Sequence, residues 1–196
     1  MGKSGWKAIT SPNRASNMFL HTERLILRNF AESDLGAFVA YRNDLQVAKY
    51  QGWNMPYSIE MAEKYITSVK DVHVPKQGHW LQVAIVLKDT DELIGDIGCF
   101  VKPEDARQAV VGFTLASKFW KIGYAAEALR CWLGYLFDDL DFHRVTADCD
   151  TENIASFRLL EKIGFRREAH FVEGYPIHGG YASEYHYGLL QREWRA

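Results

Sequence analysis

The sequence predicts a mixed α/β fold of the α+β class, and three observations support this prediction. Short β-rich runs alternate with helical patterns, and no repeat, low-complexity tract or linker interrupts residues 18–196. The chain has 196 residues, about the size of one ordinary domain. Hydrophobic residues make up 47% of it and aromatic residues 14%, which suits a sizeable core and argues against intrinsic disorder. We therefore expect one domain over residues 18–196, preceded by a polar, loosely ordered extension over residues 1–17.

The first half of this domain predicts a strand, two helices and a hairpin. The expected elements are, in chain order, a strand over 24–29, helices over 32–42 and 58–70, and strands over 80–87 and 93–102. Ser58 is a suitable N-cap for the second helix. Residues 88–92 are turn-forming, so the last two strands are expected to form a hairpin.

The second half contains the strongest helical pattern of the chain, over 123–137. Its apolar residues recur at the spacing of one buried helix face and are Ala125, Ala128, Leu129, Trp132, Leu133 and Leu136. The other expected elements are a strand over 109–115, a strand over 144–148, a helix over 154–162 and strands over 165–172 and 184–190. Gly164 stands where a helix-ending glycine is expected.

Charge and cysteine content exclude several classes of protein. The formal net charge is −2 and the pI is about 6.4, so no nucleic-acid partner is expected from global charge. The three cysteines, Cys99, Cys131 and Cys149, form no CxxC pair, and no HExxH occurs, so we expect reduced thiols and no metal. No apolar run approaches the roughly 20 residues that span a bilayer, and the first residues lack a signal-peptide core. A cytoplasmic protein without a membrane partner is expected.

The junction over 118–128 carries the first chemical signal. A strand ends there, a glycine-containing turn follows, and a helix rich in small residues begins. The N–H groups and the dipole at a helix N-terminus bind phosphate oxygens. Gly123, Ala125 and Ala126 would let a diphosphate approach the backbone, and Lys118 and Lys121 would add charge. An ordinary loop into a core helix explains the same residues.

The second signal lies over 150–165. Asn153 is a sound N-cap for the following helix, and Ser156 falls near the helix start. Both residues can be capping residues alone. A functional role for these two residues is favoured because they follow the possible phosphate-binding junction in the chain.

With these two signals, the sequence resembles the GNAT superfamily of N-acetyltransferases, especially the RimJ/RimL-like branch that acetylates N-terminal amines of ribosomal proteins. The motifs that carry the resemblance occur in unbroken order over residues 18–196: Thr22 to Arg28, Leu93 to Gly95, Val111 to Phe113, Trp120 to Ala128, Asn153 to Phe165 and Leu189 to Trp194. Each motif is degenerate, but six in family order are specific.

The resemblance implies a GNAT-type fold: a central, mostly antiparallel twisted sheet, flanked by helices, whose fourth and fifth strands splay apart. Acetyl-CoA, the co-substrate, would lie between these two strands. Phe113, Thr114 and Leu115 would bind its pantetheine arm, Phe113 and Leu115 by backbone pairing, and Asn153 would bind the cofactor or a water. The implied pyrophosphate cradle consists of the backbone groups of Lys121, Ile122, Gly123, Tyr124, Ala125 and Ala126.

Three positions depart from the family pattern. Lys121 stands where relatives usually have a glycine, and a lysine can hold the left-handed backbone at modest cost or contact phosphate directly. Leu160 stands where many relatives have a tyrosine acid, so Ser156 becomes the expected proton donor to the CoA thiolate. Val110 stands where some relatives have a glutamate. Glu173 is then the best candidate for the catalytic base, although a solvated strand-edge charge is the commoner explanation of such a residue.

The acceptor is expected to be a primary amine. An α-amino group with a pKa near 8 is about a tenth neutral at pH 7, which costs only ~1.4 kcal/mol, whereas a lysine amine costs roughly 4.6 kcal/mol. A site without an obvious base therefore favours a protein or peptide N-terminus, with Trp53 and Tyr175 as expected substrate-binding walls or as plain packing aromatics. A small-molecule amine acetyltransferase and a non-catalytic acetyl-CoA-binding module are the alternatives, and the residues allow a monomer or a homodimer.

Overall fold

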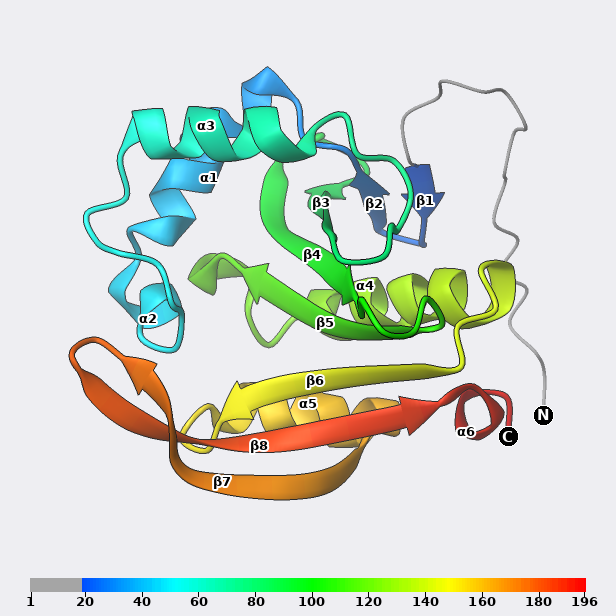
Figure 1. Ribbon diagram of the computed structural model, residues 1–196. Coiled ribbons are helices and arrows are strands. Elements are labelled where there is room, and N and C mark those ends of the chain that lie inside the picture. The colour runs from blue at the N-terminus through cyan, green and yellow to red at the C-terminus, as the bar shows by residue number, and fades with distance from the viewer. Residues whose placement is uncertain (1–18) are drawn as a thin grey trace.

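A computed structural model describes residues 19–196, and the expected extension over residues 1–17 lies outside them. One eight-stranded sheet, ordered β1-β2-β3-β4-β5-β6-β8-β7, runs through the molecule (Figure 1). The strands are β1 (Phe19–His21), β2 (Leu25–Arg28), β3 (Trp80–Leu87), β4 (Leu93–Val101), β5 (Gln108–Leu115), β6 (Arg144–Asp150), β7 (Arg166–Ile177) and β8 (Gly180–Leu190). The helices are η1 (Glu32–Asp34), α1 (Leu35–Arg42), α2 (Leu45–Ala48), α3 (Ile59–Val69), η2 (Ser117–Phe119), α4 (Tyr124–Gly134), η3 (Tyr135–Asp139), α5 (Ile154–Ile163) and α6 (Gln191–Trp194). The predicted mixed α/β class is confirmed.

All neighbouring strands are antiparallel except β5 and β6, which are parallel. Their pairing covers only Gln108–Arg144, Ala109–Val145 and Val110–Thr146. Beyond these pairs the two strands diverge toward their C-terminal ends, leaving a V between them (Figure 1). The splay implied for the fourth and fifth strands of the family sheet is therefore present, here between β5 and β6.

The two faces of the sheet are covered differently. Helices α4 and α5 pack on one side, here called the back face, where a core cluster contains Trp132, Leu160 and Tyr187. Helices α1 and α3 cover the opposite, front face only near β3 and β4, where Phe38 and Tyr41 are buried. The front face of β5, β6 and β8 carries no helix (Figure 1).

Local chemistry explains the element boundaries. The Ser58 hydroxyl accepts from the Met61 N–H (3.2 Å) and caps α3, as predicted. The predicted helix over 123–137 is α4, which continues into a π-helical turn, η3. Gly164, at φ 118°, ends α5 in the left-handed conformation expected of it.

The last two strands are longer than predicted and form one long hairpin. His178 and Gly179 join them, and both have positive φ (50° and 80°), which is the geometry of a type I′ turn. The twist of that turn matches the twist of the flanking strands, so pairing extends to Ile177 and Gly180. The sequence pattern, which stopped at residue 172, did not reveal this extension.

Candidate active site

The inner edge of β5 has free backbone groups inside the V. The Ala116 N–H donates to the Ile94 carbonyl (2.9 Å), and in an antiparallel ladder the bonded positions alternate. Even-numbered residues of β5 therefore bond to β4, and Phe113 and Leu115 turn their N–H and C=O groups toward β6, where pairing has already ended. An extended ligand can pair with such an edge. Thr114 directs its backbone to β4 instead, and its side chain is buried on the front face.

Trp120 occupies one position of this edge. Its indole N–H donates to the Leu115 carbonyl (2.8 Å), while the rest of the side chain is 38% exposed. A ligand that pairs along β5 meets this indole at the end of the strand. The carbonyl keeps a second lone pair, so the two interactions are compatible.

The loop from β5 to α4 forms a concentration of free amides. Lys121 (φ 64°) and Gly123 (φ 95°) both lie in the left-handed region, so the lysine adopts the conformation that glycine favours. None of the six N–H groups from Lys121 to Ala126 has an acceptor among residues 19–196, and the first helical bond is donated by Glu127 to Gly123. These N–H groups converge at the positive end of the α4 dipole, a suitable arrangement for a diphosphate.

An arginine that the sequence analysis did not select holds this loop to α4. Arg24 donates through Nε to Glu127 Oε2 (2.7 Å) and through Nη1 to the Ile122 carbonyl (3.3 Å). Its guanidinium lies 4.4 Å from the Tyr124 ring centre and remains 40% exposed. Thr22 also donates to Glu127 (2.5 Å), and these contacts lower the pKa of the Glu127 carboxyl although partial burial opposes them. The second predicted cation, Lys118, pairs with Glu92 instead (2.6 Å).

Comparison with known proteins identifies the family of this fold. The profile of the acetyltransferase (GNAT) domain matches residues 24–166. The chain belongs to the GNAT acetyltransferase family. It is 33% identical over 177 residues to the N-acetyltransferase YnaD of Bacillus subtilis (strain 168), covering 90% of this chain and 99% of that one. The resemblance stated above is confirmed at the level of the family, and the chain is an acyltransferase.

Solved structures share the fold over nearly the whole chain. A GNAT-family acetyltransferase from Bacillus anthracis superimposes with a TM-score of 0.77 at 28% identity, over 89% of this chain and 99% of that one. RimL, a ribosomal-protein acetyltransferase solved in complex with coenzyme A, superimposes with a TM-score of 0.78 at 19% identity, over 88% and 98% of the two chains. The GNAT fold uses acetyl-CoA, and the free amides and the open β5 edge fit that ligand.

The start of α5 lies at the other arm of the V. Asn153 caps this helix, since its side-chain oxygen accepts from the Ser156 N–H (3.2 Å). The Ser156 side chain lies beside the Cys149 thiol at the end of β6. Burial raises the pKa of the Cys149 thiol to about 12, although Ser156 and Arg167 oppose the shift. This GNAT chain therefore keeps a protonated thiol, not a nucleophile, beside the serine.

The expected acceptor walls meet across the molecule. Tyr175 reaches from β7 to the loop after α2, where its hydroxyl would lie 2.7 Å from a Cβ added to Gly52. Trp53 in the same loop is half-buried, donates to the Arg42 carbonyl (3.0 Å) and packs on the Arg42 guanidinium (4.3 Å). Glu173 is exposed on β7 at φ 49°, and its N–H donates to Ser183 (3.0 Å). The catalytic role of Glu173 and the binding role of Trp53 stay predictions.

The segment around α2 bridges the wide end of the V. Asp44 accepts a hydrogen bond from Ser117, which follows β5. Tyr50 donates to the Glu152 carbonyl (3.2 Å) and Lys49 pairs with the Glu152 carboxylate (3.6 Å), both after β6. Residues 44–50 thus contact both arms where they are furthest apart.

A buried polar network lies beneath α1 on the front face. The Asp96 carboxylate accepts from Tyr41 and from Gln82 (2.5 Å) and faces Arg42 at 3.9 Å. The Arg42 guanidinium lies within 4.3–5.1 Å of the ring centres of Phe38, Trp53, Tyr57 and Tyr65. Burial raises the pKa of the Asp96 carboxyl, while Arg42 opposes that shift.

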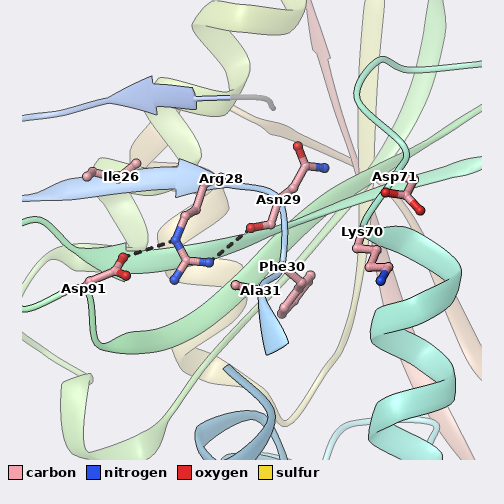
Figure 2. A pocket seen from close by; sticks show the side chains of 8 residues that line it. All are labelled: Ile26, Arg28, Asn29, Phe30, Ala31, Lys70, Asp71 and Asp91. Atoms are coloured by element: carbon pink, nitrogen blue, oxygen red, sulfur yellow. Dashed lines mark hydrogen bonds and ion pairs between the residues drawn. The ribbon is translucent and has the colours of Figure 1, made fainter. Parts of the chain in front are cut away.

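A cavity of about 460 Å³ lies elsewhere, at the edge of β2 (Figure 2). Arg28 lies on its wall, bonded to Asp91 (3.2 Å) and to the Asn29 carbonyl (3.1 Å), and pairs with buried Asp34 (2.7 Å). Strands β3 and β4 lie between this cavity and the V in the order of the sheet. Within residues 19–196, no helix has the length and apolar character of a membrane span, and no cluster of His, Cys, Asp or Glu side chains could hold a metal ion.

Proposed function

We propose that this chain transfers the acetyl group of acetyl-CoA directly to a primary amine, and that the amine is the N-terminus of a protein or peptide. One observation supports the transfer: the free backbone edge of β5 is followed directly by a loop with six free amide N–H groups. Support for a peptide acceptor comes from the uncovered front face, where Trp80 is 49% exposed beside Gly112. A chain end can approach such an open face.

The proposed reaction is a single transfer. The neutral amine attacks the thioester carbon, a new C–N bond forms, and the C–S bond breaks with its electron pair going to sulfur. The Phe113 N–H on the open edge would polarise the thioester oxygen. Ser156 would supply the proton that the departing sulfur takes up, a role that its position at the start of α5 supports. The nitrogen loses one proton as the amide forms, and this proton restores the Ser156 hydroxyl through solvent.

Binding and turnover test this proposal separately. Calorimetry with acetyl-CoA is followed by a thiol-release assay over a panel of peptide amines, lysine derivatives, diamines and amino sugars. We expect binding, and turnover that is fastest with a peptide α-amine. Absence of binding would refute the enzyme assignment at this site, and binding without turnover on any amine would indicate an acetyl-CoA-binding module.

Ser156→Ala is expected to slow turnover by about 100-fold, as loss of a general acid does. The affinity for acetyl-CoA should change little, because the diphosphate cradle lies on α4, not on α5. Single-turnover rates and calorimetry separate the two quantities. Ser68→Ala on exposed α3 is the matched control, and an unchanged rate in Ser156→Ala would remove the role given to this serine.

A small cationic amine is the second candidate acceptor, and one observation favours it. Asp148 and Glu184 lie on the open front face of β6 and β8, where they flank His186. Such carboxylates attract an ammonium group. Faster turnover of a diamine or amino sugar than of any peptide in the same panel would favour this acceptor class over the first.

A further inference from the structure

A histidine held between two carboxylates lies on the uncovered face of the sheet. His186 on β8 places Nε2 2.8 Å from Glu184 Oε1 and Nδ1 3.3 Å from Asp148 Oδ1. The Phe171 ring packs on the imidazole, with ring centres 4.5 Å apart. The three side chains remain between 21% and 41% exposed, so a substrate on this face can reach them.

Strand register puts this group beside the V. On β6 the alternate residues Val145, Ala147 and Cys149 point into the back-face core, so Asp148 points to the front. The last paired positions of β5 and β6 are Val110 and Thr146. Two residues further on, about 7 Å along the strands, Gly112 and Asp148 face each other across the first opening of the V.

Gly112 belongs to the strand whose free edge receives the thioester in the proposed function. With no side chain at this position, the front face stays open over β5; an added Cβ would first meet the Trp80 ring at 4.0 Å. An amine that approaches the thioester from the front therefore passes between Trp80 and Asp148. The pair of Asp148 and His186 lies beside this approach.

The contacts around the imidazole leave one ring nitrogen available. With the proton on Nε2 and donated to Glu184 Oε1 (2.8 Å), Nδ1 carries a lone pair and lies 3.3 Å from the Asp148 carboxylate. The pair can therefore accept a proton with its geometry already formed. Partial burial raises the pKa of the Asp148 carboxyl, which helps it to take part.

We propose that the pair of His186 and Asp148, rather than Glu173, accepts the proton of the acceptor ammonium, with Glu184 as the positioning residue that fixes the imidazole. The inference rests on the proposed acetyl transfer. One proton moves from the R–NH₃⁺ group to the pair, directly or through one water, and the neutral amine then attacks the thioester. The pair returns the proton to solvent after the amide has formed.

Other charges around the pair set the pH range in which it works. Asp150 lies two residues along β6, opposite Glu184 in the strand register. Lys102 at the end of β4 acts on Asp148 and opposes the effect of burial. The ion pair of Arg144 and Glu168 lies at the next front-face position, beside Gly188.

His186→Gln tests the proposal through both rate and pH dependence. With an amine of pKa near 10, kcat/KM at pH 7 should fall by about 100-fold. With an α-amine of pKa near 8 the loss should be less than about tenfold and should shrink further at pH 9, because more of the amine is already neutral. The affinity for acetyl-CoA should not change.

Asp148→Asn separates a proton acceptor from a structural residue. Its kcat/KM for an amine of pKa near 10 should fall at pH 7 as in His186→Gln, whereas a merely structural change would also alter the affinity for acetyl-CoA or the free energy of unfolding. His143→Gln, at the exposed residue directly before β6, is the matched control and should keep the wild-type rate and pH profile. Glu173→Gln is measured as the competing variant.

The outcomes distinguish the two proposals. If wild-type protein acetylates no amine, the proposed function fails, and this inference fails with it. If wild-type protein is active but His186→Gln keeps its rate and pH profile, the proton acceptor lies elsewhere while the function stands. If Glu173→Gln loses the fall of kcat/KM at low pH while His186→Gln keeps it, Glu173 is the proton acceptor.

Discussion

Gly123→Val is expected to weaken acetyl-CoA binding by at least about 100-fold while leaving the protein folded. Gly123 stands at φ 95° directly before α4, where a β-branched residue is strained by about 1–2 kcal/mol. An added Cβ would also lie 3.4 Å from Arg24 Nη2, the cation that ties the loop to α4. Relaxing this strain would turn the free amides away from one another, and each lost bond to a charged oxygen costs about 1.5–3 kcal/mol.

Two substitutions at Lys121 provide the controls for this experiment. Lys121→Gly fits the left-handed backbone of that residue (φ 64°) and should preserve the loop. Lys121→Gln removes the charge but keeps the length of the side chain. Calorimetry on the three variants separates backbone geometry from charge: if Gly123→Val binds acetyl-CoA like the wild type, the loop is not the diphosphate site.

Arg42→Ala is expected to lower the free energy of unfolding by about 3–5 kcal/mol. Arg42 is only 7% exposed, and its removal leaves the Asp96 carboxylate, itself 2% exposed, without its opposing charge. It also removes a cation from four surrounding aromatic rings. Urea unfolding measures the change. Arg166→Ala, which breaks exposed ion pairs with Glu168 and Glu193, should cost no more than about 1 kcal/mol.

The pH dependence of the free energy of unfolding of Arg42→Ala tests whether the loss comes from the uncompensated Asp96 charge. Burial raises the pKa of Asp96 above its unfolded value, and loss of Arg42 raises it further, so the folded variant binds a proton that the unfolded chain releases. The stability loss should therefore be largest at pH 8 and shrink as the pH falls toward 5. Adding Asp96→Asn should recover part of the loss. A loss independent of pH, or no recovery, would point to packing alone.

Elements with strong local signals could be predicted from the sequence. The apolar stripe from Ala125 to Leu136 predicted α4, Ser58 marked the start of α3, and Gly164 marked the end of α5. Weak local signals failed: α2 is one turn long, and β1 is a three-residue strand held by β2. Strand β1 is too short to give a local pattern of its own, and the α2 segment is held by Ser117 and Glu152, which lie far along the chain.

The part of the candidate site that could be predicted from the sequence is the part formed by backbone amide groups. The loop from Lys121 to Ala126 is a continuous segment with one glycine, so a local motif could reveal it. Side-chain groups were missed because they join distant segments. Arg24 meets Glu127 across the β1–β2 turn and α4, and Asp148 meets His186 only because β6 and β8 pair in one particular register.

The open edge of β5 also bears on solubility. An unpaired strand edge is a template for strands of other chains and thus a start for aggregation. Here the exposed ladder is only Val111 to Leu115, its last carbonyl is already bonded to Trp120, and the bridge from Asp44 to Ser117 closes off the end. The protein therefore keeps a strand edge available to its own ligand while offering a neighbouring molecule too short a stretch on which to add a strand.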